Sequence, residues 1–139
     1  MTLDTTGITQ ALTPLNNALE LLDETASDNE RLRLALQDSV VQRFEYTYEM
    51  SWKLMKRWIS DNVSPEDSEP GWSRRELYRL AAKTGLIAEP KRWFAYHEAR
   101  NVSSHTYHKA SAAKVMAVVR EFATDTACLV QVINEQEPS

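Results

Sequence analysis

The chain has 139 residues, of which 42% are hydrophobic, and a formal net charge of −4 at pH 7. This length suits a single domain, residues 1–139, with a hydrophobic core, and no apolar run approaches the roughly 20 residues that a membrane-spanning helix needs. The start of the chain has neither the basic residues nor the apolar run of a secretory signal, so we expect a cytoplasmic protein without a membrane partner.

The first two predicted elements are helices, because glycine and proline are few and no alternating Val/Ile/Thr run suggests a strand. The first helix covers residues 7–24 and has apolar residues at a helical spacing on one face. The second is capped by Asp28 and meets no Pro or Gly before Asn62, so it is about 50 Å long at 1.5 Å per residue. A helix of this length in a small domain is expected either to kink or to protrude as an interface helix. Its apolar stripe consists of Leu32, Leu36, Val40, Phe44, Tyr48, Trp52, Met55 and Ile59.

Three further helices follow a loop over residues 63–71. Ser73 and Glu76 form a capping box at the start of the third helix, and Gly85 is expected just after its end. Pro90 opens a fourth helix that runs to about Arg100. The last helix is predicted over residues 111–135. Five helices with mostly short connections predict an all-α protein, an antiparallel up-and-down bundle of four to five helices.

The second helix carries two acidic residues, Glu45 and Glu49, four positions apart and with Lys53 four beyond. We interpret them as a solvated face, in which Lys53 offsets the mild repulsion, rather than as an acid/base or partner-binding pair. The aromatic residues around them are expected to serve core and dimer packing rather than base stacking. The lone Cys128 stands among apolar residues of the last helix and is expected to be small, buried and without a catalytic role.

Positive charge and all three histidines are concentrated between residues 83 and 120 of this acidic chain. Such a segment either attracts an anion or is a solvated helix face with a chance bias. No Gly-rich phosphate loop and no Cys/His metal spacing occur. The histidines have only Glu98 as a nearby carboxylate, so we expect no metal and no cofactor.

The pattern Arg-x4-His occurs twice. Arg92 and His97 lie on the fourth predicted helix, where five residues rotate by about 140°, so their side chains are expected to point apart. Between Arg100 and His105 stands Asn-Val-Ser-Ser, which favours turns and caps over the interior of a helix. If the helix unwinds there, His105 can turn back toward Arg100.

An Arg and a His brought together in this way suit a phosphodiester. Arg100 offers a planar and permanently charged fork for the phosphate oxygens, and His105 can transfer a proton near pH 7. RNA supplies its own nucleophile in the 2′-OH, so no metal is required. The alternative is structural, with Arg100 capping helix carbonyls and His105 capping the next helix. Tyr107 lies at the rim of the site if the segment is extended, and away from it if the last helix has already begun.

Three segments resemble those of a known family. "QRFEYTYEMSWKLMKRWI" (42–59), "AAKTGLI" (81–87) and "RNVSSHTY" (100–107), in this order, are similar to the nucleotidyltransferase substrate-binding proteins of the HEPN superfamily, which include HepT-like toxins. The resemblance covers about residues 8–135. It implies a dimeric helical bundle of the KNTase C-terminal/HEPN-like kind, with the Arg-x4-His-x-Tyr motifs of both subunits meeting at the interface.

The resemblance also implies roles for individual residues and partners. Arg100 and His105 would be catalytic, with Asn101 and Ser104 as supporting flanks and Tyr107 as a modification site. The function implied is that of a metal-independent endoribonuclease, the toxin of a type VII-like toxin–antitoxin pair. A cognate minimal nucleotidyltransferase would act as the antitoxin and attach adenylyl groups to Tyr107. The alternative within the same family is a non-catalytic substrate-binding subunit of a two-component nucleotidyltransferase.

Overall fold

The structure, a computed structural model, describes residues 3–63, 72–105 and 109–136, with the backbone alone at residues 104, 105, 109 and 110. Within these ranges the chain forms five helices and no strand, which confirms the predicted all-α class. The helices are α1 (Thr6–Glu24), α2 (Glu30–Asn62), α3 (Arg74–Lys83), α4 (Pro90–His105) and α5 (Lys109–Gln136).

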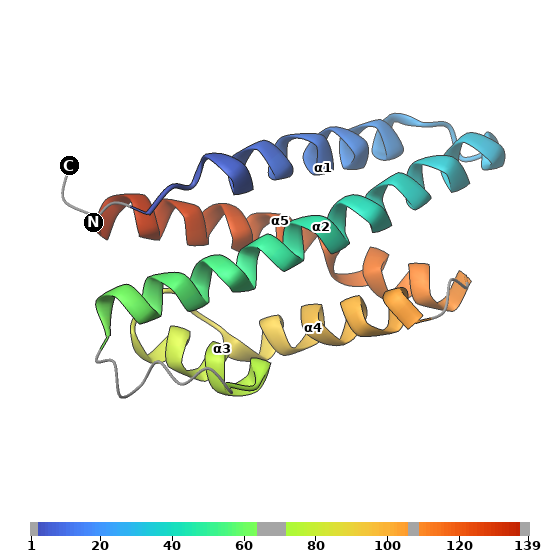
Figure 1. Cartoon of the computed structure of the whole chain (residues 1–139). Helices are drawn as coiled ribbons and strands as arrows, with labels where there is room; N and C mark the ends of the chain where they lie inside the picture. Colours follow the sequence, from blue (N-terminus) through green and yellow to red (C-terminus); the bar gives the residue numbers. More distant parts are fainter. Residues whose placement is uncertain (1–2, 64–71, 106–108, 137–139) are drawn as a thin grey trace.

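The helices form an up-and-down bundle (Figure 1). α1 and α2 make a long hairpin, α5 packs along both of them, and α4 lies against α2 and α5 with the short α3 beside it. The start of α1 meets the end of α5, where the Thr5 hydroxyl donates to Asn134 Oδ1 at 3.1 Å. In the described residues no helix is long and apolar enough to cross a membrane.

Two of the predicted helix boundaries are confirmed in atomic detail and a third is corrected. Ser73 Oγ accepts from the backbone N–H of Glu76 and donates to its carboxylate, which is the predicted capping box of α3. Gly85 follows α3 with φ +84°, a conformation that favours glycine. The cap of α2 is Asn29 rather than Asp28, since Asn29 Oδ1 accepts from the N–H of Leu32 at 3.4 Å.

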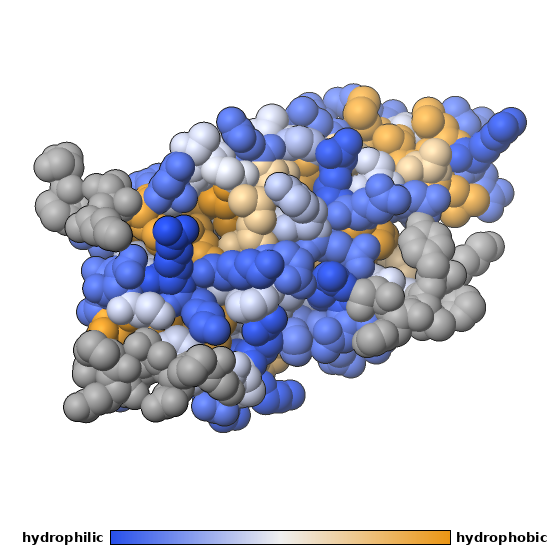
Figure 2. All heavy atoms as spheres, in the orientation of Figure 1, coloured by the Kyte–Doolittle hydropathy of each residue, from blue (hydrophilic) through white to orange (hydrophobic). Residues whose placement is uncertain are grey.

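The long helix α2 is continuous from Glu30 to Asn62. From Val40 onward the members of its apolar stripe are buried, except Trp52, which is partly buried. Leu32, the first member, remains 45% exposed, and the nearby Leu34 is 42% exposed. Figure 2 shows hydrophobic atoms on the surface at the end of the α1–α2 hairpin, where these leucines lie with Leu21. The predicted stripe is therefore correct for the central and C-terminal parts of α2 and wrong for its first turn.

An aromatic core fixes α4 against α2 and α5. The ring of Phe122 on α5 packs edge-on against Phe44 of α2 at a centroid distance of 5.0 Å and against Tyr96 of α4 at 5.3 Å. Trp93 joins the same cluster, 5.1 Å from Tyr96. These side chains are almost completely buried, so they set the register between the helices that carry the polar site described next.

Candidate functional site

Arg100 of α4 lies between two carboxylates of α2. Its Nη1 is 3.3 Å from Glu45 Oε2, and its Nε is 3.4 Å from Glu49 Oε1. Residues four apart on a helix share a face, which is why one guanidinium reaches both carboxylates. The Nε–H is buried and does not align with the Glu49 oxygen as a hydrogen bond, so this second contact is electrostatic.

Neighbouring side chains hold the two carboxylates in place. The buried Ser103 hydroxyl lies 3.1 Å from Glu45 Oε2 and the same distance from the backbone carbonyl of Arg100. Trp52 Nε1 donates to Glu49 Oε2 at 3.1 Å. Each acidic side chain therefore has a second partner that fixes its rotamer, and the guanidinium is oriented by side chains that are themselves ordered.

α4 does not end at Arg100 as predicted, because its backbone is helical through His105. The unwinding of residues 101–104 that would bring His105 back toward Arg100 is therefore absent from the structure. The side chains of Ser104 and His105, and the whole of Tyr107, lie outside what the structure describes. Asn101 is exposed, and its Nδ2 lies 3.2 Å from His97 Nε2.

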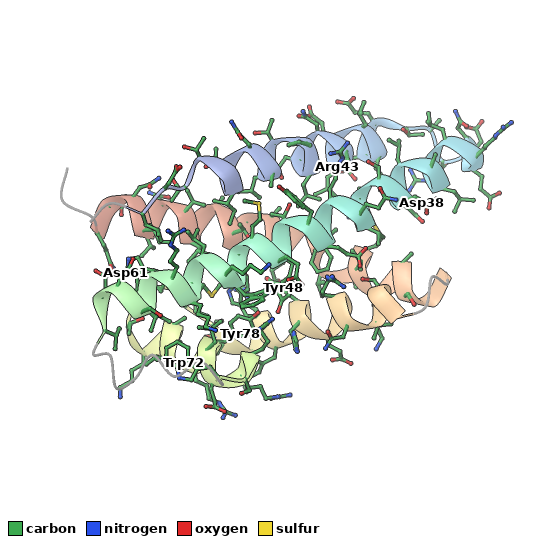
Figure 3. The ribbon with its side chains drawn as sticks, in the orientation of Figure 1. Asp38, Arg43, Tyr48, Asp61, Trp72 and Tyr78 are labelled. Carbon is green, nitrogen blue, oxygen red and sulfur yellow. The ribbon has the colours of Figure 1, made fainter. Side chains whose placement is uncertain are left out.

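A buried chain of hydrogen bonds runs beside this site from α3 to α4. The hydroxyls of Tyr78 and Tyr48 bond to each other between α3 and α2. Figure 3 labels both side chains. Tyr48 Oη also lies 3.0 Å from His97 Nδ1. When Asn101 donates to Nε2 of a neutral His97, the Nδ1–H is left to donate to Tyr48.

The environment of this chain favours the uncharged form of each group. Burial lowers the pKa of His97, and the positive charges of Arg74 and Arg75 add to that effect. Burial raises the pKa of Tyr48 to about 12, against the opposing effects of Tyr78 and Arg74. Burial also raises the pKa of Tyr78.

Arg92 and His97, the first Arg-x4-His pair, have separate partners. Arg92 binds Asp125 of α5 with two nitrogens, Nη2 at 2.7 Å and Nε at 3.1 Å, and also lies 3.2 Å from Glu121. His97 bonds instead to Tyr48 of α2. The prediction that Arg92 and His97 point apart is confirmed.

Two further interpretations of the sequence were wrong. Glu45 and Glu49 are not a solvated face, because both contact Arg100. Their four-residue spacing indicated that they share one face of α2, but the sequence did not indicate which helix that face would contact. Cys128 is exposed on α5 rather than buried. Among the side chains that are described, no group of three His, Cys, Asp or Glu residues gathers as metal ligands would.

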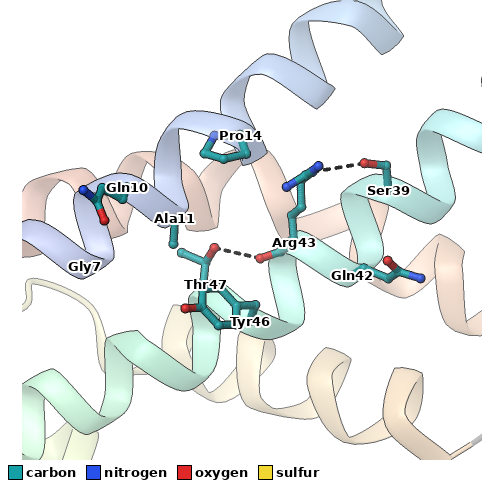
Figure 4. A pocket seen from close by; sticks show the side chains of 9 residues that line it. All are labelled: Gly7, Gln10, Ala11, Pro14, Ser39, Gln42, Arg43, Tyr46 and Thr47. Carbon is teal, nitrogen blue, oxygen red and sulfur yellow. Dashed lines mark hydrogen bonds between the residues drawn. The ribbon is translucent and has the colours of Figure 1, made fainter.

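A separate pocket of about 400 Å³ lies between α1 and α2 (Figure 4). Arg43 Nε donates to Ser39 Oγ there at 3.1 Å, and Tyr46, which is 63% exposed, stands on its wall. Its lining does not include Arg100 or the carboxylates that hold it. This pocket is therefore distinct from the site on α4.

Comparisons with known proteins connect this chain and its fold to one family. Residues 9–135 match the family model described as "Nucleotidyltransferase substrate binding protein like". A curated relative from Haemophilus influenzae, described as a probable ribonuclease HepT, is 31% identical over 96 residues, which are 69% of this chain and 66% of the relative. The aligned part thus spans slightly less than two thirds of that protein.

Two solved structures share the fold. A Haemophilus influenzae protein, described as revealing the fold of a substrate-binding domain of a nucleotidyltransferase, is 26% identical, with a TM-score of 0.80 over 94% of this chain and 99% of that one. A crystal structure from Thermus thermophilus is 24% identical, with a TM-score of 0.66 over 88% of this chain and 98% of the other, and shows the fold alone.

Proposed function

Because this chain belongs to the nucleotidyltransferase substrate-binding protein family of HepT-like HEPN proteins, we propose that it is a ribonuclease toxin paired with a minimal nucleotidyltransferase. The observation that carries this proposal is the guanidinium of Arg100, held between Glu45 and Glu49 at the head of the Arg-x4-His segment. The name of the curated relative, a probable ribonuclease, supports the same reaction class.

Arg100 is suited to bind a phosphate while it is held by carboxylates. The two ion pairs use Nη1 and Nε, so Nη2 is the guanidinium nitrogen outside them. Fixing one side of a planar guanidinium leaves the direction of its other N–H groups defined, which is what a phosphate site in an enzyme requires. The same acidic neighbours reduce the net positive charge, so ground-state binding of RNA is expected to be weak.

In the proposed reaction the 2′-OH of RNA attacks the adjacent phosphorus. The O2′–P bond forms and the P–O5′ bond breaks, which leaves a 2′,3′-cyclic phosphate and a 5′-OH. His105 takes the proton from the 2′-OH, and a second His105, from the other subunit of a homodimer, gives a proton to the leaving O5′. Arg100 stabilises the charge that develops on the phosphate oxygens, and no metal takes part.

The reaction is tested with purified protein and single-stranded RNA in a buffer that contains EDTA. We expect slow cleavage with cyclic-phosphate ends by the wild-type chain and none by Arg100→Ala or His105→Ala. Arg57→Ala, an exposed position on α2, is the matched control and is expected to cleave normally. Cleavage that persists in His105→Ala would contradict the mechanism. Sedimentation of the same samples at micromolar concentration tests the homodimer.

A second function is favoured by the family description and by the solved relative described as a substrate-binding domain. In that case the chain would hold substrate for a nucleotidyltransferase without cleaving RNA. The same assay separates the two: a chain that cleaves no RNA, but raises the rate of nucleotide transfer by its cognate enzyme, is a binding subunit.

We also propose that the nucleotidyltransferase silences the toxin by adenylylating Tyr107. Transfer from ATP would form a bond between the Tyr107 oxygen and the α-phosphorus, release pyrophosphate, and place a new negative charge on the motif. That phosphate can pair with Arg100, and the adenosine excludes RNA by its bulk. The cognate nucleotidyltransferase is then both a partner and an antitoxin.

A further inference from the structure

A basic pocket lies between the start of α3 and α4, next to the Arg100 site. It has a volume of about 490 Å³. Its walls include three cations, Arg74, Arg75 and Lys91, together with His97 and Asn101. Because Asn101 directly follows Arg100 on α4, the pocket and the proposed catalytic site share one stretch of helix.

The positive charge of this pocket is not neutralised by carboxylates. The ion pairs of the described residues occupy Arg92, Arg100, Lys114 and Arg120, and none involves the three cations of the pocket. The one carboxylate on its wall, Glu98, is paired with Lys114 at 3.3 Å.

Two of the three cations are held by aromatic rings instead. Arg74 Cζ lies 3.2 Å from the centroid of the Trp52 ring, and Arg75 Cζ lies 4.6 Å from that of Phe94. A guanidinium stacked on a ring keeps its charge and can still donate through its edge. Arg74 Nε is moreover buried without a hydrogen-bond partner in the described part of the chain.

The ligand class follows from the charge and from the position. Three unneutralised cations attract a polyanion, and the start of α3 adds the partial positive charge of a helix N-terminus. The pocket runs along α4 from Asn101, the residue after Arg100, to Lys91 near the start of the helix. Lys91 lies nine residues before Arg100, about 13 Å along the helix axis. A strand with phosphates repeated along its backbone can place one at each position, whereas the adjoining phosphates of a single nucleotide lie too close together to reach both.

We propose that Arg74, Arg75 and Lys91 form a backbone-phosphate subsite for the RNA strand whose scissile phosphodiester is bound at Arg100. This inference rests on the proposed function. The subsite supplies affinity for RNA in the ground state. Arg100 contributes little of this affinity, because Glu45 and Glu49 offset its positive charge. It binds phosphates rather than bases, so it positions RNA without selecting a sequence.

The test uses a charge-removing double variant, Arg75→Gln with Lys91→Gln. Both positions are exposed, so the fold is expected to survive, and a circular dichroism spectrum checks it. The matched control is Arg57→Gln with Lys83→Gln, which removes the same charge from exposed positions outside the pocket. The probe is a short, fluorescently labelled single-stranded RNA with 2′-O-methyl groups, which binds without being cleaved.

The measured quantity is the binding constant as a function of salt concentration. Removal of two phosphate contacts is expected to lower the slope of log K against log[salt] by about 1.4, because each contact in single-stranded RNA contributes about 0.7. The control double variant is expected to keep the wild-type slope. RNA is also expected to shift the NMR signals of the His97 imidazole in the wild type and not in the pocket variant.

Each alternative outcome is decisive. Equal slopes for the two double variants, or a wild type that does not bind the RNA, would overturn the subsite. If ATP binds and its affinity falls in the pocket variant while that of RNA does not, the pocket serves a nucleotide and the proposal is wrong. The double variant can show the predicted loss of slope while the wild-type chain fails to cleave unmodified RNA. That result would support the subsite and contradict only the ribonuclease activity.

Discussion

Glu45 Oε2 lies 3.3 Å from Nη1 of Arg100, so a carboxylate of the longest helix is in direct contact with the arginine of the Arg-x4-His segment. Glu49 makes a second contact from the next turn of the same helix. An arginine paired in this way is not a freely moving cation. Its position depends on α2, which makes the two glutamates positioning residues for any phosphate that Arg100 binds.

The first prediction concerns these carboxylates. We expect Glu45→Gln with Glu49→Gln to lower kcat for RNA cleavage by about tenfold, which is about 1.4 kcal/mol of transition-state stabilisation, because Arg100 loses its fixed direction. KM is expected to stay equal or to fall, since two negative charges near the RNA are removed. Steady-state kinetics on folded protein separate the two effects.

The control for this pair is Asp23→Asn, which breaks the exposed ion pair with Arg120 between α1 and α5. That variant is expected to leave both kinetic parameters unchanged. A rise in KM with constant kcat in the glutamate variant would show instead that the carboxylates assist binding of RNA, and would contradict a positioning role.

The second prediction concerns the buried hydroxyls of Tyr48 and Tyr78. Tyr48 bonds to both Tyr78 and His97, so Tyr48→Phe leaves one buried and one partly buried polar group without a partner and is expected to cost about 2–3 kcal/mol of folding stability. Tyr78→Phe breaks one bond and is expected to cost about 1 kcal/mol. Urea unfolding measures both free energies. Equal losses of unfolding free energy in the two variants would mean that the hydrogen bond between Tyr48 and His97 does not contribute to stability.

How far the sequence predicted this site depends on which forces fix each residue. The start and end of α3 were predictable because Ser73, Glu76 and Gly85 act through local backbone geometry. The end of α4 was not. Ser103 has a low intrinsic preference for a helix interior, yet it is buried there and its hydroxyl contacts both Glu45 and the Arg100 carbonyl. Tertiary contacts of this kind override local preference.

Tertiary contacts also limit what the sequence reveals about the acidic residues of α2. A four-residue spacing indicates that Glu45 and Glu49 share a face, but the identity of the facing helix follows from the aromatic core around Phe122, which involves three helices distant in sequence. A single amino-acid sequence carries no direct signal for that pairing. For this reason the motif around Arg100 was predicted, whereas its environment was not.

The third prediction is a loss of stability at alkaline pH. Burial raises the pKa of Tyr48 to about 12, above the value of about 10 for an unfolded chain. Below pH 10 both states keep the proton and the contribution of Tyr48 is complete; above it the unfolded state loses the proton first, so the free energy of unfolding falls between pH 10 and 12. Urea unfolding at several pH values measures this slope. We expect a shallower slope in Tyr48→Phe and the wild-type slope in Tyr46→Phe, which changes an exposed ring.

The last prediction concerns Tyr107, which lies two residues beyond the described end of α4. A phenol with a pKa near 10 is a poor acid at pH 7, and cleavage of RNA by Arg100 and His105 does not require one, so its place in the motif suits modification better than catalysis. We expect the cognate nucleotidyltransferase with Mg-ATP to add one or more adenylyl groups to the wild-type chain and none to Tyr107→Phe, as read from intact masses. Tyr46→Phe, at an exposed position on α2, should be labelled like the wild type.

The modified protein should lose RNA cleavage, because the new phosphate pairs with Arg100 and the adenosine covers the site. Equal labelling of wild type and Tyr107→Phe would place the modification elsewhere, and labelled protein that still cleaves RNA would separate modification from silencing.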